Sequence, residues 1–313
     1  MELFGSNFDD SVFSEAKDRG SVCVPSYNAK SCEPEWFCEG AALDTEDSLE
    51  KQKVLKFRGD LATRQGKYQA ALDAYSGCLE WISDNNLSIK RDILEGMARC
   101  YTRLDQRDRA MGLLDLLSKE ASNTCHLTSL LLLKVSVYQH FGVIGPWMSS
   151  LQELCSLVPF NPWNWCNLGK MCLQLLEDST TLDKKGKEAE EQQEELSEER
   201  LWLKACLCFI RTRLLLRILQ QQQSSFVLRH NQNVVQIAED ALGRLNPDQA
   251  TLLTLTEVIS EDLNPEKMKE DYQDGMSLSS VCLQSFEERW WNKILLSGVL
   301  ETDGYHRLSG TKV

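Results

Sequence analysis

Hydrophobic positions recur every three or four residues along most of the chain from residue 49 to 296, which is the period of amphipathic helices. The clearest stretch is LKFRGDLATRQGKYQAALDAYSGC, residues 55–78. It predicts a helix over about 49–64, a tight turn at Gly66 and a second helix over about 68–82. Such a hairpin cannot bury its own apolar face and needs stacked neighbours, as in tetratricopeptide-type repeats.

The first hairpin and the segment that follows it share one spacing. In the first hairpin the repeat positions are Leu55, Gly59, Ala62, Gly66, Tyr68, Ala71, Tyr75 and Cys78. In the second they are Leu94, Met97, Ala98, Tyr101, Ala110, Leu114 and Leu117. Asp105 stands where the first hairpin has its turn glycine, and aspartate tolerates the left-handed conformation of such a turn. The sequence therefore predicts two successive repeats.

Later repeats are less regular. Helices are expected over 127–141 and 147–157, with Gly142, Gly145 and Pro146 between them. Trp165 opens a fourth unit after Asn161-Pro162, and its first helix is expected to end near residue 177. An acidic, Gln-rich insertion at 178–199 follows; it is either a loop or an N-terminal extension of the next apolar helix. In both cases we expect it outside the packed core.

The C-terminal part predicts further helices over 226–245 and 248–261, each ending before an Asn-Pro pair. A loop over about 264–277 and a last amphipathic helix over 278–296 follow. The predicted fold is all-α, a tetratricopeptide-like helical-hairpin superhelix with a C-terminal helical cap. Its parts are an arm (1–48), repeats (49–222), C-terminal helices (223–300) and a tail (301–313).

Charge is unevenly distributed along the chain. The net charge is −13, from 34 basic and 47 acidic residues. Residues 1–47 contain eleven acidic and three basic side chains, and residues 183–200 contain eight acidic and four basic ones. The acidity therefore belongs to the arm and the insertion, and it argues against a nucleic-acid partner, which needs a basic surface. The isolated aromatic residues of the arm favour docking on the chain's own scaffold over a motif for a partner.

Cysteine usage and hydropathy indicate a reducing compartment. Twelve cysteines occur without a secretory signal at the N-terminus, which predicts buried thiols in a cytoplasmic or nuclear protein. The longest apolar helix, over 201–219, carries four basic residues, so no membrane partner is expected.

A family resemblance rests on four short sequence motifs that occur together in this order: CEPEWF (32–37), FNPWNW (160–165), FIRTRLLL (209–216) and FEERWW (286–291). With FRGDLA (57–62), they resemble a vertebrate family of uncharacterised proteins encoded by an open reading frame on human chromosome 8. The resemblance spans nearly the whole chain. It implies an α-helical repeat fold and no catalytic residues.

No motif for chemistry is present, so neither an enzyme nor a cofactor is predicted. Cys23, Cys32 and Cys38 lack the spacing of zinc ligands, and Cys206 and Cys208 diverge on one helix, so no metal site is expected. The four histidines are dispersed, and phosphate-binding and dinucleotide-binding loops are absent. The many carboxylates lie in charge runs that are typical of solvated surfaces.

The first helices of such repeats line a concave groove, and we expect the groove of this chain to bind a protein or peptide. The candidate groove residues are Lys53, Lys56, Asp60, Thr63, Asp92, Glu95, Arg99 and Thr102. Repeats that clamp a C-terminal carboxylate need asparagines where this chain has Asp60 and Gly96. Because Asp60 would repel a carboxylate, a chaperone-type carboxylate clamp is not expected.

Several large side chains have two interpretations. Trp165 is expected in the core, whereas Trp163 is as consistent with a docking role as with burial. Trp290 and Trp291 are adjacent, which predicts that one is buried and the other partly exposed for docking, with Trp290 the candidate. Arg211 and Arg213 are expected to reach the surface or to pair with the acidic arm or insertion.

We therefore predict a non-catalytic scaffold or adaptor that binds a partner through its helical-repeat groove. The alternative is an obligate structural subunit of a larger complex, whose groove is filled by its own N-terminal arm. An enzyme is the least favoured interpretation, because it would need a polar pocket that the sequence does not show.

Overall fold

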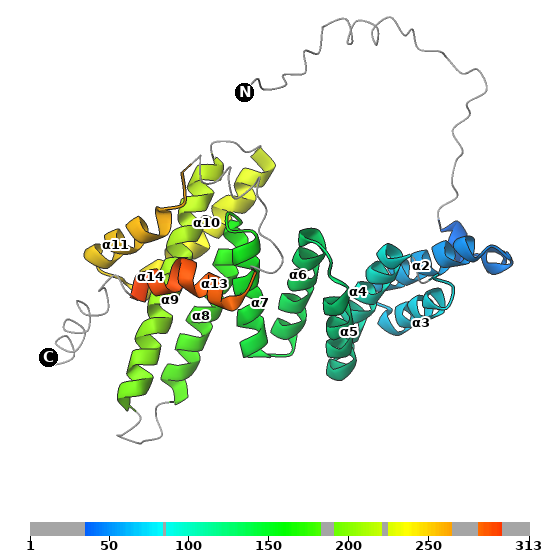
Figure 1. Cartoon of the computed structure of the whole chain (residues 1–313). Helices are drawn as coiled ribbons and strands as arrows, with labels where there is room; N and C mark the ends of the chain where they lie inside the picture. The colour runs from blue at the N-terminus through cyan, green and yellow to red at the C-terminus, as the bar shows by residue number, and fades with distance from the viewer. Residues whose placement is uncertain (1–34, 84–85, 183–190, 221–224, 265–280, 296–313) are drawn as a thin grey trace, which may run out of the picture.

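The computed structural model describes residues 35–83, 86–182, 191–220, 225–264 and 281–295. These residues form helices joined by turns and contain no β-strand, so the predicted all-α class is confirmed (Figure 1). Outside them lie most of the predicted arm, the middle of the predicted insertion, most of the predicted loop after Asn264 and the tail.

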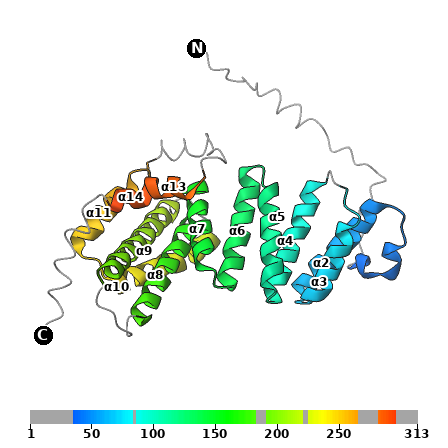
Figure 2. The ribbon, with the colours of Figure 1, turned by 60° about the horizontal axis from the view of Figure 1, so that its bottom comes forward.

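Three helical hairpins stand in a row in the N-terminal half (Figure 2). They are α2 (Ser48–Arg64) with α3 (Tyr68–Leu79), α4 (Leu87–Arg103) with α5 (Arg107–Glu120), and α6 (Thr124–His140) with α7 (Ile144–Leu157). Each helix packs on the next one along the chain. The first hairpin begins and ends within about three residues of the predicted bounds, because its apolar spacing is regular.

The turn inside each hairpin contains one residue in the left-handed conformation. Gly66 and Gly142 have φ of 74° and 63°, and Asp105 has φ of 54°. The prediction that Asp105 replaces a turn glycine is thus confirmed. Helix α7 begins earlier than expected, at Ile144, because Pro146 lies in its first turn, where no backbone N–H is needed.

The longest helices follow, α8 (Pro162–Leu182) and α9 (Glu191–Gln220). They pack closely at Gly169, where a Cβ atom would lie 3.1 Å from Cys208 and Phe209. Helix α8 runs past its predicted end near residue 177, so residues 178–182 of the predicted insertion belong to it. Residues 191–199 extend α9 at its N-terminus, as in the second of the two alternatives, and residues 183–190 lie outside the described part of the chain. The hydroxyl of Ser179 donates a 2.7 Å hydrogen bond to Glu198, so the flanks of the insertion contact each other.

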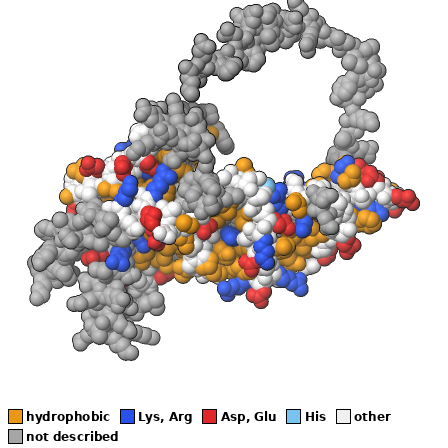
Figure 3. Space-filling model, in the orientation of Figure 1, with side chains coloured by type: hydrophobic (Ala, Val, Ile, Leu, Met, Phe, Trp, Pro, Cys, Tyr) orange, Lys and Arg blue, Asp and Glu red, His pale blue; other side chains and the backbone are white. Residues whose placement is uncertain are grey.

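The C-terminal helices cover α9. They are α10 (Ser225–Leu245), α11 (Gln249–Ser260) and a short final segment made of α13 (Leu283–Phe286), the π-helical turn η4 (Glu287–Trp291) and α14 (Asn292–Leu295). With α7 to α9 they form one apolar core that includes Trp165, which is fully buried as predicted. Figure 3 shows that hydrophobic side chains also gather on the surface in the middle of the molecule, over α5 to α7.

The prediction that one of Trp290 and Trp291 is exposed is wrong, because each is only 3% exposed. The final segment has α7 on one side and α11 on another, so two of its faces are covered. Trp290 packs edge-on against Trp165, with ring centroids 5.1 Å apart, whereas Trp291 packs against Phe286 and lies under the ammonium group of Lys204. Trp290 is therefore not an exposed docking residue.

Arg211 also departs from its prediction, since its side chain is completely buried. Two of its nitrogens donate hydrogen bonds of 2.7 and 2.9 Å to the two carboxylate oxygens of Asp262. The guanidinium group also donates to the carbonyl oxygens of Ile259 and Pro159 and lies 5.0 Å from the ring centroid of Trp165. Arg211 thus joins α8, α9 and α11, whereas Arg213 is partly exposed.

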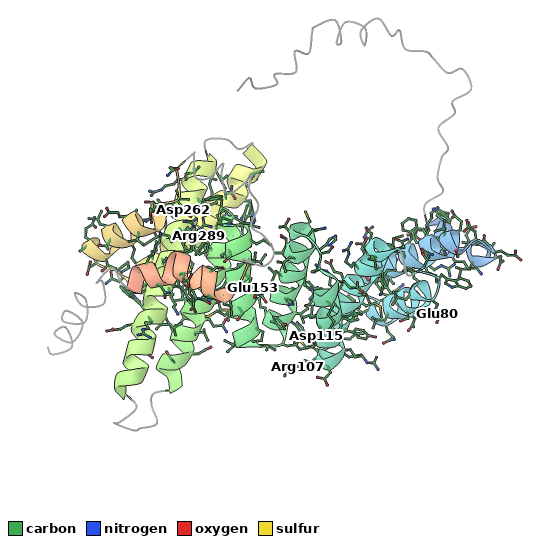
Figure 4. The ribbon with its side chains drawn as sticks, in the orientation of Figure 1. Glu80, Arg107, Asp115, Glu153, Asp262 and Arg289 are labelled. Carbon is green, nitrogen blue, oxygen red and sulfur yellow. The ribbon has the colours of Figure 1, made fainter. Side chains whose placement is uncertain are left out.

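Asp262 receives a second arginine from the final segment. Arg289 donates a 3.1 Å hydrogen bond to it, and Figure 4 shows the two side chains side by side. Burial alone would raise the pKa of Asp262, but hydrogen bonds and charge from Arg211 and Arg289 outweigh it, so that its pKa lies below the ordinary value. The carboxylate therefore stays charged at neutral pH.

Gly59 tests the packing of the first hairpin. A Cβ atom at this position would overlap the buried ring of Tyr75, so we expect Gly59→Ala to lower the free energy of unfolding by about 1–3 kcal/mol. Gly112 on α5 faces open space, and Gly112→Ala should leave stability unchanged or raise it slightly. Thermal unfolding of both variants measures the difference. Equal melting temperatures would contradict this packing.

Asp262 tests the C-terminal half. Removing its charge leaves Arg211 buried without a counter-ion, so Asp262→Asn should cost about 3–5 kcal/mol. The neighbouring Glu261 binds Lys293 at the surface, and Glu261→Gln should cost less than about 1 kcal/mol. Denaturant unfolding compares the two variants.

The same pair sets a pH dependence. Because the pKa of Asp262 is lower in the folded than in the unfolded protein, its stabilisation is complete above the unfolded value of about 3.9. It is lost as the pH falls through the lower, folded value. Wild type should therefore lose more stability than Asp262→Asn below about pH 4. Parallel pH profiles would show that the pair is not coupled to folding.

Candidate partner-binding groove

The first helices of the three hairpins, α2, α4 and α6, line a cavity of about 460 Å³. Thr63 of α2, Arg99 and Thr102 of α4, and Ser136 and Gln139 of α6 contribute to its wall. A second cavity of about 150 Å³ lies between α4 and α6, toward the N-terminal ends of these helices. The two cavities form the candidate groove.

The predicted groove residues do not all lie in these cavities. Thr63, Arg99 and Thr102 line the first cavity, and Asp92 and Glu95 line the second. The remaining three, Lys53, Lys56 and Asp60, line neither. Lys53 is exposed and pairs with Glu50 at 2.6 Å. The structure thus brings five of the eight predicted residues to the groove wall.

Lys56 and Asp60 instead belong to a polar network beneath the groove. The ammonium group of Lys56 lies 3.0 Å from one carboxylate oxygen of Asp60, and the hydroxyl of Tyr75 donates a 2.8 Å hydrogen bond to the other. The Tyr75 hydroxyl is also 3.3 Å from the hydroxyl of Thr63, which lies 3.4 Å from the thiol of Cys100. This network connects α2, α3 and α4.

Tyr75 explains why positions 59 and 96 are glycines. Its ring passes between α2 and α4, where Gly59 and Gly96 leave room for it. A Cβ atom at Gly96 would lie 3.0 Å from the ring, so a larger residue does not fit there without a shift. Burial raises the pKa of Tyr75 well above its ordinary value, so its hydroxyl stays protonated and donates to Asp60.

Sequence reasoning missed the contribution of α6. Besides Ser136 and Gln139, this helix supplies Leu133, Val137 and His140 to the first cavity. The signal that would have found them is the distance from the left-handed turn residue. Thr63, Thr102 and Gln139 each lie three residues before such a turn residue, at 66, 105 and 142.

The same kind of count singles out one exposed hydrophobic residue on α6. Lys56, Glu95 and Leu132 each lie ten residues before the turn residue of their hairpin. Leu132 is 49% exposed, which is unusual beside the fully buried Leu131 and Leu133. Leu132 lines neither cavity, but its position is equivalent to that of Glu95, which lines the second cavity. Helix α6 therefore has an exposed apolar side chain at the position where α4 presents a charge to the groove.

The described part of the arm lies elsewhere. Its short helices η1 (Trp36–Cys38) and η2 (Gly40–Leu43) pack on α2. Trp36 and Phe37 contact the ring of Phe57, and Arg58 donates hydrogen bonds to the carbonyl oxygens of Phe37 and Glu39. Docking on the chain's own scaffold is thus confirmed for residues 35–43. None of these residues lines either groove cavity.

Trp163 is a weaker docking candidate than the sequence suggested. Its side chain is partly buried against the C-terminal core, and its ring centroid lies 6.0 Å from that of His230.

Among the described residues, no group of three or more His, Cys, Asp or Glu side chains is placed to hold a metal ion. Within the same ranges no helix is long and apolar enough to span a membrane.

Comparison with known proteins supports the resemblance inferred from the sequence motifs. Residues 2–182 and 172–296 match the sequence model of a family of unknown function (DUF5588). The chain is 34% identical to "Uncharacterized protein C8orf76" of Homo sapiens and 30% identical to its homolog in Rattus norvegicus, over 93% of both chains in each case. No solved structure matches the chain at a significant level.

Tyr75 tests the network beneath the groove. Tyr75→Phe removes the hydroxyl that bonds Asp60 and contacts Thr63, so it should cost about 1 kcal/mol of stability. Tyr101 is partly buried in the same core, and its hydroxyl makes no hydrogen bond within the described ranges, so Tyr101→Phe should cost less. Denaturant unfolding compares them. An equal loss in both variants would show that the network contributes nothing.

Proposed function

We propose that this chain, which belongs to the family of unknown function DUF5588, is a non-catalytic scaffold that binds a segment of another protein in the groove of α2, α4 and α6. The observation that carries the proposal is the repetition of equivalent positions on three helices around one cavity. Thr63, Thr102 and Gln139 each lie three residues before the left-handed turn residue of their hairpin, and all three line this cavity. A surface built in this way suits an elongated ligand that crosses successive helices.

The size and composition of the groove also favour a peptide ligand. A volume of about 460 Å³ accommodates a few side chains, and the wall alternates hydroxyl, amide and cationic groups with apolar ones. Polar groups of this kind fix the orientation of a ligand, while apolar contacts supply most of the free energy. Leu132 lines neither cavity, but it is the candidate apolar contact because it is exposed at the position equivalent to Glu95, which lines the second cavity.

The alternative, a groove filled by the chain's own arm, has less support. The described part of the arm contacts Phe57 and Arg58, which lie outside both cavities. Residues 1–34 lie outside the described residues. A chain that lacks only residues 1–34 separates the two functions, because it keeps the docked segment 35–43. Under the alternative, this deletion would lower the melting temperature and leave the set of bound proteins unchanged.

A point variant tests the groove directly. Leu132→Glu places a charge where we expect a partner side chain to be buried, and it should weaken capture of a groove partner by tenfold or more. Leu116 is also exposed, at 38%, but it lies on α5 rather than on α2, α4 or α6, so Leu116→Glu is a matched control. Quantitative affinity purification from vertebrate cells, followed by mass spectrometry, compares wild type with both variants.

The expected result is a group of proteins that wild type and Leu116→Glu capture equally and that Leu132→Glu loses. Circular dichroism should show the same helicity and melting temperature for both variants, since both positions are exposed. Identical protein lists for all three chains would contradict the groove proposal.

A further inference from the structure

The first cavity of the groove has a distinct charge. Arg99, Arg103 and His140 line it, and its wall contains no carboxylate. The second cavity is different, since Asp92 and Glu95 line it together with Arg91, which bonds His126. The charge of the groove therefore changes from acidic to basic toward the C-terminal ends of α4 and α6.

Two of the three basic groups have carboxylate neighbours that an incoming ligand can replace. Glu95 binds Arg99 at 2.6 Å from one turn away, and Asp105 binds His140 at 2.7 Å. Exposed pairs of this kind contribute about 0.2–1 kcal/mol, and Asp105 is itself 81% exposed. Arg103 makes no ion pair within the described ranges. A ligand anion would therefore find one unpaired guanidinium group and a second that is held weakly.

Helix dipoles give a competing account of these residues. Arg103 and His140 lie in the last turns of α4 and α6, where a positive charge stabilises the helix. This account explains a basic residue at each helix end. It does not explain why three basic groups from two helices converge on one cavity with hydroxyl groups of Thr63, Tyr68 and Ser136 around them.

We propose that this cavity binds an acidic side chain of the partner segment, with Arg103 and Arg99 as the groups that pair with its carboxylate. The proposal rests on the groove function proposed above and adds the chemistry of the ligand. The guanidinium groups donate charge-assisted hydrogen bonds, and the hydroxyl groups supply further donors. Because the whole chain carries a net charge of −13, the attraction is local to the cavity rather than a property of the surface.

The test uses the purified full chain and an array of 12-residue peptides. Each peptide is printed in three versions that differ only in two central residues, which are both Glu, both Gln or both Lys. Wild type should bind Glu versions at least tenfold more strongly than their Gln counterparts. Arg103→Gln should reduce this preference to threefold or less, and Arg103→Glu should favour the Lys versions.

Arg107 provides the matched control. It is an exposed arginine at the start of α5, at the lower end of this helix in Figure 4, and it lines neither cavity. Arg107→Glu makes the same change of charge as Arg103→Glu and should keep the wild-type preference. Equal effects of the two variants would overturn the proposal, because they would show a response to net charge alone. The helix-dipole account would be favoured if Arg103→Gln lowered the melting temperature and left the peptide preference unchanged.

Two further variants, Leu132→Glu and the chain that lacks residues 1–34, distinguish a failure of the acidic-ligand proposal from a failure of the groove function. If peptides bind without charge preference and Leu132→Glu abolishes their binding, the acidic ligand is excluded and the groove function stands. If Leu132→Glu has no effect on any peptide, the groove function fails. If only the chain that lacks residues 1–34 binds Glu versions, the chain's own arm occupies the cavity, and the proposal of a separate partner is overturned. Absence of binding by every chain also overturns it.

Discussion

The ion pair between Arg211 and Asp262 is the constraint on which the C-terminal half of the structure depends. A fully buried guanidinium group is costly unless a carboxylate and additional acceptors compensate it. Asp262 and the carbonyl oxygens of Ile259 and Pro159 supply these acceptors, and they come from segments before and after α9. Folding of this half therefore requires α8, α9 and α11 to reach one arrangement together, and Arg289 extends the requirement to the final segment.

The N-terminal half is organised by a different rule. The two helices of each hairpin are joined by a turn with a left-handed residue, at positions 66, 105 and 142, and each helix packs on its neighbour. Close approach of α2, α3 and α4 depends on Gly59 and Gly96, which leave space for Tyr75. Repeats of this kind add stability through neighbouring contacts. The C-terminal helices that Arg211 holds together pack on α7, the second helix of the last hairpin. This contact fixes the hairpin whose first helix, α6, forms one wall of the groove.

Much of the fold follows from the sequence because helix period and turn chemistry are local. The bounds of α2 and the left-handed Asp105 are of this type. Burial of Arg211 was not predictable, since its partner Asp262 is 51 residues away and nothing local indicates the pairing. Burial of both Trp290 and Trp291 was missed because a single helix face was assumed, whereas α7 and α11 cover two faces. The share of α6 in the groove was missed because its apolar spacing is irregular, although its turn residue preserves the register.

The residues that identify the family and the residues that would bind a partner are therefore different sets. FNPWNW, FIRTRLLL and FEERWW meet in the core around Arg211, where Trp165 and Trp290 pack near its guanidinium group. These motifs contribute to the packing of the C-terminal helices. Their presence in a related chain therefore indicates the same C-terminal packing, but it gives no information about a ligand. Under the proposed function, the ligand would be determined by exposed positions counted back from each turn, such as Arg99, Leu132 and Gln139. Two related chains can share every one of these motifs and still differ in partner, because surface positions of the groove change at little cost to folding.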